Sequence, residues 1–152
     1  MQNKRIDLIS LKICKDKSLR YDDTKANNPE KAYRIIRDFI GETDREYFGV
    51  LNLDNRNNIC SIEICSIGTV NTTIIHPREV FKGAIKCNSS KIILFHTHPS
   101  DSLTPSSCDI STTKDLYLIS KIIEIPIVDH IIVSSNDFFS FASNGLVFGE
   151  EE

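Results

Sequence analysis

A histidine pair followed by a serine and an aspartate is the group of residues in this chain best suited to chemistry. His96 and His98 are separated by one residue, and Ser106 and Asp109 follow after a short loop, so the pattern reads His-x-His-x7-Ser-x2-Asp. Imidazole nitrogens and carboxylate oxygens are ligands that zinc accepts, and three such ligands with an open fourth position are typical of a catalytic zinc site. The pattern therefore predicts that His96, His98 and Asp109 bind Zn²⁺.

The elements around these residues should bring their side chains together. Residues 91–95 are mostly apolar and include β-branched residues, which predicts a buried strand that ends at the histidines. Residues i and i+2 of a strand point to the same side, so both imidazoles can reach one ion while Thr97 faces away. Pro99 ends the strand, and Thr-Pro-Ser at 104–106 is typical of a helix start, which places Asp109 in the first helical turn.

Each of these residues also has a simpler interpretation. A single histidine is usually a surface or core residue, Asp109 alone would be an acid favoured near a helix N-terminus, and Ser106 alone would be a helix cap. Ser106 can serve as a cap and still take part in a site. We favour the metal site because these residue types coincide with a strand end, a proline-interrupted loop and a helix start.

Further motifs accompany the pattern. They are His-Pro-Arg-Glu-Val-Phe at 76–81, His-Thr-His-Pro-Ser at 96–100, Thr-Pro-Ser at 104–106, Asp-His-Ile-Ile-Val at 129–133, Ser-Phe at 140–141 and Asn-Gly-Leu at 144–146. The main pattern resembles that of the JAMM/MPN+ metalloproteases, and the accompanying motifs are similar to those of the RadC-like JAB domain within that superfamily. The resemblance runs from about residue 44 to residue 146. We expect the N-terminal helix-hairpin-helix region of full-length RadC proteins to be absent from this chain.

The resemblance implies a role for a glutamate upstream of the histidines. Members of the superfamily carry a general base on an upstream strand, and Glu46, at the start of a predicted strand, matches that position. Glu42 and Glu63 are the alternatives, and Glu46 could also be a solvated carboxylate at a strand edge. The resemblance also assigns the third ligand to Asp109 rather than to the neighbouring Cys108.

The implied activity is zinc-dependent hydrolysis of a peptide or isopeptide bond, with ubiquitin-like conjugates as one substrate class. Glu46 would take a proton from the attacking water and pass it to the leaving amine, and the Ser106 hydroxyl would bind the developing oxyanion. A DNA-repair-associated role of the RadC type and a non-catalytic MPN scaffold are the alternatives. A net charge of −3 without a Lys/Arg block argues against direct nucleic-acid binding. The complete set of ligand residues argues against a scaffold.

The histidine loop departs from the RadC-like pattern at two positions. That pattern reads His-Asn-His-Pro-Ser-Gly, whereas this chain has Thr97 for the asparagine and Asp101 for the glycine. Thr97 should be tolerated because it points away from the metal. Asp101 introduces a charge and a Cβ where glycine leaves the backbone free, so the family pattern does not predict the shape of this loop or its substrate preference.

Four other residues of the matching motifs have no chemical assignment. His76, Arg78 and Glu79 lie at a charged helix start, where a structural role is favoured over a catalytic one. His130 is expected to be a core histidine or to contact a metal ligand, rather than to bind the metal, because three ligands are already supplied.

The composition is that of one globular domain. The chain has 152 residues, with 40% hydrophobic and 26% charged residues, and no apolar stretch long enough to span a bilayer. Its five cysteines are scattered and odd in number, which favours reduced thiols and a cytoplasmic protein. The sequence leaves open whether the chain forms a homo-oligomer.

The hydrophobic pattern predicts a mixed α/β order of elements. We expect strands at 6–14, 47–53, 58–67, 69–75, 91–96, 127–134 and 138–142, and helices at 29–40, 77 to about 88–90, and about 106–123. Residues 1–43 would supply an N-terminal strand and helix that pack on a core of residues 44–148. The expected fold is a three-layer α/β arrangement with a mixed, curved sheet flanked by helices, which is the JAB/MPN (cytidine-deaminase-like) fold that the resemblance implies.

Overall fold

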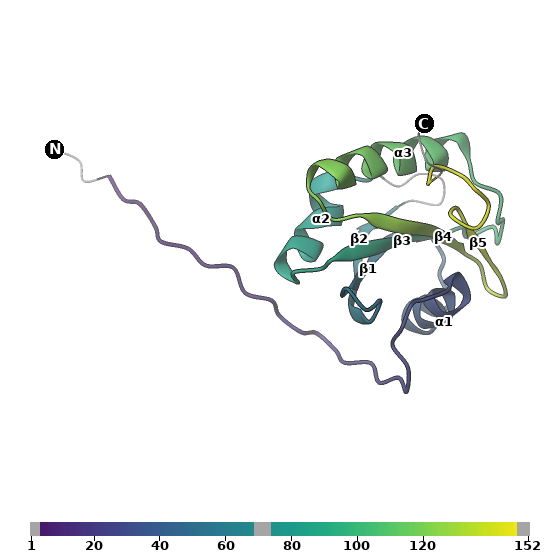
Figure 1. The fold of residues 1–152 in the computed structure, drawn as a ribbon, viewed down its shortest axis with the longest axis horizontal. Helices are drawn as coiled ribbons and strands as arrows, with labels where there is room; N and C mark the ends of the chain where they lie inside the picture. The colour runs from purple at the N-terminus through teal and green to yellow at the C-terminus, as the bar shows by residue number, and fades with distance from the viewer. Residues whose placement is uncertain (1–3, 69–73, 149–152) are drawn as a thin grey trace.

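The computed structural model describes residues 4–68 and 74–148, which form a mixed sheet with helices on both faces (Figure 1). In chain order the elements are α1 (Pro29–Ile40), β1 (Tyr47–Leu53), β2 (Ile59–Ile67), α2 (Pro77–Lys86), β3 (Lys91–Thr97), α3 (Ser107–Ile122), β4 (Ile127–Val133) and β5 (Phe138–Ser140). The strand order is β2-β1-β3-β4-β5. The β3–β4 pair is parallel and the other pairs are antiparallel.

The helices cover the two faces of the sheet unequally. Helix α1 lies on one face, and α2 and α3 lie on the other (Figure 1). Each face has its own hydrophobic core, one with side chains from α2 and α3 and one with side chains from α1. This is the three-layer α/β arrangement expected for a JAB/MPN fold, and that prediction is confirmed.

The alternation of side chains along β3 decides which residues face α3. Ile92 and Leu94 belong to the core beneath α2 and α3, whereas Ile93 and Phe95 belong to the core beneath α1. Because successive side chains of a strand point to opposite faces, His96 continues the first row. The end of β3 therefore presents a histidine to the face on which α3 begins.

Most of the predicted elements are confirmed to within a few residues. The hairpin of β1 and β2, helices α1, α2 and α3, and strands β3 and β4 all lie where the pattern predicts them. The last strand ends at Ser140 rather than at 142, because residues 141–145 turn back on themselves through hydrogen bonds such as that from the Leu146 amide to the Phe141 carbonyl.

The predicted strand at 6–14 is wrong. Residues 4–20 form neither helix nor strand, and the side chains of Ile6, Leu8 and Ile9 are at least 79% exposed. The pattern of this segment suits a strand, but a strand also needs a neighbour whose backbone completes its hydrogen bonds. In the described part of the chain no such neighbour pairs with it. The predicted strand at 69–75 lies mostly outside the described residues, and Ile74 and Ile75 form neither helix nor strand.

Candidate metal centre

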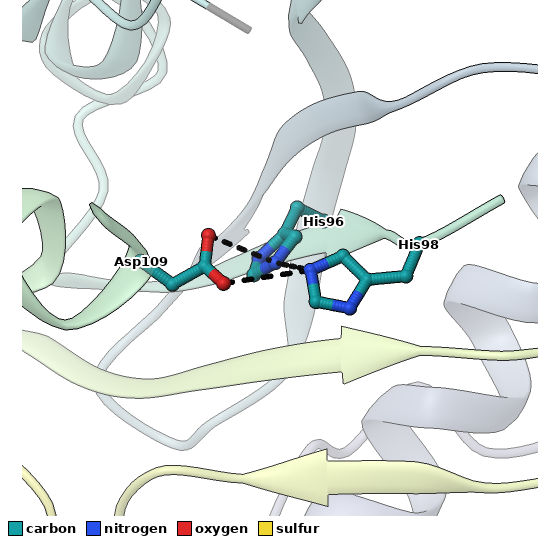
Figure 2. A group of neighbouring side chains, drawn as sticks. All are labelled: His96, His98 and Asp109. Carbon is teal, nitrogen blue, oxygen red and sulfur yellow. Dashed lines mark hydrogen bonds and ion pairs between the residues drawn. The ribbon is translucent and has the colours of Figure 1, made fainter. Parts of the chain in front are cut away.

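Three side chains converge where β3 ends and α3 begins. His96 Nε2 lies 2.9 Å from His98 Nε2 and 3.4 Å from Asp109 Oδ1, and His98 Nε2 lies 3.5 Å from Asp109 Oδ2. Figure 2 shows the two imidazoles and the carboxylate pointing toward one another. Ligands at about 2.0–2.2 Å from a tetrahedral zinc ion lie roughly 3.3–3.6 Å apart. The two histidine–aspartate distances match this spacing, and the distance between the two imidazole nitrogens is shorter. Among the described residues, this is the one group of His, Cys, Asp and Glu side chains close enough to hold a metal.

Helix α3 holds Asp109 in place through its first turn. The Ser106 side chain accepts a hydrogen bond from the Asp109 amide at 3.0 Å, and the Asp109 carboxylate accepts one from the Ser106 amide at 2.7 Å. This reciprocal pair is a capping box in which aspartate replaces the usual glutamate or glutamine. The carboxylate is thereby aimed back over the start of the helix, toward the histidines.

The loop after β3 orients His98. Its Nδ1 lies 2.7 Å from the Ser102 backbone carbonyl, which can only accept a hydrogen bond. The Nδ1 atom therefore carries the hydrogen, and in the neutral ring Nε2 is left with a lone pair. That lone pair faces the position between the three side chains.

His96 has a buried partner on its other nitrogen. His96 Nδ1 lies 2.8 Å from His130 Nε2, and His130 Nδ1 lies 2.6 Å from the Thr113 hydroxyl. His130 stacks on Phe141 and packs edge-on against Phe48. The sequence alone left His130 between a core residue and a neighbour of a ligand, and the structure shows both properties.

The surroundings of Asp109 keep its carboxylate ionised. Burial by itself raises the pKa of Asp109, but hydrogen bonds and charge from His96 and His98 hold that pKa well below its ordinary value. The hydrogen bond to Asp109 raises the pKa of His98, although burial opposes the change. Burial lowers the pKa of His130 well below its ordinary value, so this ring is neutral. The carboxylate is therefore an anion with two imidazoles beside it.

Strand register places Glu46 beside the histidine pair. In the antiparallel pairing of β1 with β3, Phe48 is opposite His96, so position 46 continues the register opposite His98. Thr97 supports this start of β1, because its hydroxyl accepts from the Tyr47 amide at 3.0 Å and donates to the Arg45 carbonyl at 3.3 Å. This Thr97 hydroxyl therefore holds the backbone on both sides of Glu46.

An open cleft of about 560 Å³ joins Glu46 to the three-residue group. Its wall also contains His98, Ser106 and Asp109. Ser106 accepts its capping bond through a lone pair, so its hydroxyl hydrogen can still be donated toward the cleft. A glutamate, a hydroxyl and two of the three candidate metal ligands, His98 and Asp109, thus share one solvent-accessible space.

The two alternative glutamates lie elsewhere. Glu42 lines a second, smaller cavity of about 240 Å³, which His98 also lines but Asp109 does not. Glu63 lies under α2, where its carboxylate accepts a hydrogen bond from the Asn52 side chain at 3.1 Å and comes close to Gly83. Of the three carboxylates, Glu46 alone lines the cleft that contains His98 and Asp109.

Asp101 adopts the backbone conformation that suits glycine. Its φ is +56°, in the left-handed region, which aspartate tolerates better than most residues. Its carboxylate accepts hydrogen bonds from the Ser135 amide at 2.8 Å and the Ser135 hydroxyl at 3.0 Å. The loop thus keeps a glycine-compatible shape and gains a link to the β4–β5 turn.

The remaining singled-out residues lie apart from this group. His76 is the N-cap residue of α2 and makes no side-chain capping bond, and Glu79 forms exposed ion pairs with Arg78 and Lys82 on that helix. Cys108 is exposed, with its sulfur 4.0 Å from the Thr112 hydroxyl, and it is not part of the three-residue group.

Comparison with known proteins places this geometry in a family. A model of the RadC-like JAB domain matches residues 26–146. The chain is 47% identical over 135 residues to a UPF0758 protein of Finegoldia magna, covering 88% of this chain and 60% of that protein. It is 42% identical over 119 residues to a UPF0758 protein of Desulforamulus reducens, covering 78% of this chain and 52% of the relative. The chain therefore spans about half to three fifths of the length of these relatives. The match over four fifths of its length shows that this chain belongs to the RadC-like JAB domain family.

Proposed function

We propose that this protein is a zinc-dependent hydrolase of the JAMM type that cleaves a peptide or isopeptide bond. The observation that carries the proposal is the shared cleft, in which Glu46 and Ser106 lie beside His98 and Asp109, two members of the candidate ligand group. Membership of the RadC-like JAB domain family supports a hydrolase, and the donor set of two imidazoles and one carboxylate suits zinc with an open position.

In the proposed site, His96, His98 and Asp109 hold the ion. Bound zinc would supply a Lewis acid that polarises the scissile carbonyl and lowers the pKa of water. The Glu46 carboxylate accepts the proton of the attacking water and delivers it to the leaving amine. The Ser106 hydroxyl donates a hydrogen bond to the oxygen on which negative charge develops.

The shape of the site favours an extended substrate over a small molecule. The cleft is open and lies on the surface between the start of β1, the loop after β3 and the start of α3. A polypeptide segment can lie in such a cleft, whereas a small-molecule site usually encloses most of its ligand. We propose a protein or peptide substrate, with ubiquitin-like conjugates as the first class to test.

The test is cleavage of ubiquitin-like substrates joined by peptide and by isopeptide bonds. We expect the wild type to cleave at least one of them, and Glu46→Gln to retain zinc while its rate falls by about 10²- to 10⁴-fold, because the amide cannot accept the proton. Glu42→Gln is the matched control, since Glu42 lines the neighbouring cavity, and it should cleave at a rate near that of the wild type.

Two results would contradict this proposal. Undiminished cleavage by Glu46→Gln would remove Glu46 from the mechanism. Zinc binding without cleavage of any substrate in the panel would contradict the substrate class.

A further inference from the structure

Behind the candidate ligands, a chain of hydrogen bonds leads from one ligand residue back to another. The Thr113 hydroxyl lies 2.6 Å from the backbone carbonyl of Asp109 and 2.6 Å from His130 Nδ1. His130 Nε2 in turn lies 2.8 Å from His96 Nδ1. The chain begins on α3, passes through β4 and ends on β3, so it connects the elements that carry two of the three ligands.

Burial isolates this chain from solvent. Thr113 is 0% exposed and His130 is 1% exposed. A buried polar group that loses its partner is costly, because no water replaces the missing hydrogen bond. The hydrogen bonds of this chain therefore depend on one another, and the direction of one decides the direction of the next.

The direction follows from the single hydrogen of the Thr113 hydroxyl. A threonine in a helix can donate to the carbonyl four residues earlier, and Thr113 does so to Asp109. His130 Nδ1 must then carry a hydrogen and donate to Thr113. In the neutral His130 ring, Nε2 is consequently bare and accepts from His96 Nδ1–H. A neutral His96 with its hydrogen on Nδ1 has a bare Nε2, which faces the bare Nε2 of His98 at 2.9 Å. Two such lone pairs attract a cation or a proton into the space between them.

The opposite direction would prevent metal binding. If Thr113 donated to His130, the His130 Nε2–H would donate to His96 Nδ1. His96 would then carry its hydrogen on Nε2, where it would occupy the lone pair that a metal needs. The direction in which the Thr113 hydroxyl donates therefore decides whether the His96 Nε2 atom has a lone pair for a metal or carries a hydrogen.

We propose that Thr113 and His130 are positioning residues that fix the metal-binding tautomer of His96. The inference rests on the proposed metal site and deepens it. His98 obtains the same tautomer from a backbone carbonyl in its own loop, whereas His96 obtains it through two buried side chains. Partners of this kind typically change metal affinity by about 10- to 100-fold when they are removed.

The first test replaces the threonine with residues that differ in the hydroxyl. Thr113→Val keeps the branched shape and removes the hydroxyl, and Thr113→Ser keeps the hydroxyl. We expect the zinc dissociation constant, measured by competition with a chelator, to rise about 10- to 100-fold for Thr113→Val. The Thr113→Ser value should stay within about threefold of the wild type, because the donor of the chain is retained.

The second test reads the tautomer itself in the metal-free protein. Long-range ¹H–¹⁵N spectra of the histidine rings should show the His96 hydrogen on Nδ1 in the wild type and in Thr113→Ser. They should show a shift toward Nε2–H in Thr113→Val. His130→Gln and His130→Leu form a further pair, because the glutamine carbonyl can accept from His96 and leucine cannot. We expect the glutamine variant to bind zinc more tightly than the leucine variant when the two metal-free variants are equally stable.

The outcomes separate this inference from the metal site on which it rests. A wild type that binds no zinc would overturn both. A wild type that binds zinc, together with unchanged affinity in Thr113→Val and in His130→Leu, would overturn the positioning role alone. A His96 hydrogen on Nε2 in the metal-free wild type would also overturn it, and this measurement requires no variant to fold.

Discussion

At the scale of single residues, the two histidines of the site depend on different parts of the molecule. The Nδ1 atom of His98 is held by the Ser102 carbonyl within the loop, and that of His96 is held by His130 in the core. Asp109 is held by its own helix cap. The side chains of the three ligands therefore have different immediate partners, and the buried hydrogen bonds of Thr113 and His130 link His96 to the backbone of Asp109.

We expect His98→Ala to lose stoichiometric zinc while the protein remains folded. The imidazole of His98 is a proposed ligand and lies at the edge of the cleft rather than in either hydrophobic core. Loss of a ligand should weaken zinc binding by more than about 100-fold, since loss of a group that only orients a ligand costs about 10- to 100-fold. Elemental analysis of the purified proteins measures the effect.

His76→Ala is the control for this prediction. His76 is exposed at the start of α2 and lies outside the group of His96, His98 and Asp109. The zinc content of the His76→Ala protein should therefore equal that of the wild type. Full zinc content in His98→Ala would exclude this histidine as a ligand.

At the scale of elements, the site depends on how closely β1 lies against β3. Gly49 of β1 is opposite Phe95 of β3, and the Phe95 ring fills the space that a side chain at position 49 would need. The same pairing brings position 46 opposite position 98. The absence of a side chain at position 49 thus allows the strand pairing on which the cleft depends.

We expect Gly49→Ala to destabilise the protein by about 1–3 kcal/mol through overpacking. The added Cβ would lie 2.3 Å from a Phe95 ring carbon and 2.5 Å from the backbone oxygen of Glu63, so neighbouring strands would have to move. Denaturant unfolding measures the change in the free energy of unfolding. Cys60→Ala, at an exposed position of β2, should change it by less than about 0.5 kcal/mol. Equal stability of Gly49→Ala and the wild type would show that the sheet adjusts without cost.

At the scale of the whole molecule, two cores hold the sheet and the N-terminal segment belongs to neither. Most of the core residues come from α1, α2, α3 and the strands, and residues 4–20 are exposed throughout. Unlike residues 4–20, helix α1 packs on the sheet, and its Ala32 and Ile36 side chains are fully buried. None of the described helices is long and apolar enough to cross a membrane.

We expect deletion of residues 1–20 to change the free energy of unfolding by less than about 1 kcal/mol, because exposed side chains contribute little to stability. Deletion of residues 1–41, which removes α1 as well, should destabilise the protein by several kcal/mol, at about 1.5–3 kcal/mol for each large buried apolar side chain lost. Thermal or denaturant unfolding distinguishes the two. A large loss from the shorter deletion would show that residues 4–20 pack on the domain.

Local patterns determined most of the secondary structure and the grouping of His96, His98 and Asp109. Side-chain alternation along a strand and the cap at the start of α3 involve residues that are near neighbours in the chain, so backbone geometry alone relates them. The same reasoning predicted that Thr97 faces away from the histidine pair, and its side chain indeed bonds to the start of β1.

Only the tertiary structure decided the contacts between distant segments. Glu46 shares the cleft while Glu63 lies under α2, because strand register and helix packing place these two carboxylates. The sequence had favoured Glu46 through the resemblance to the family rather than through a local pattern. His130 contacts His96 across 34 residues, which required the parallel pairing of β4 with β3. The prediction of a strand at 6–14 was wrong for the same reason. A strand forms when another segment completes its hydrogen bonds, and the identity of that partner is a property of the whole fold rather than of the local pattern.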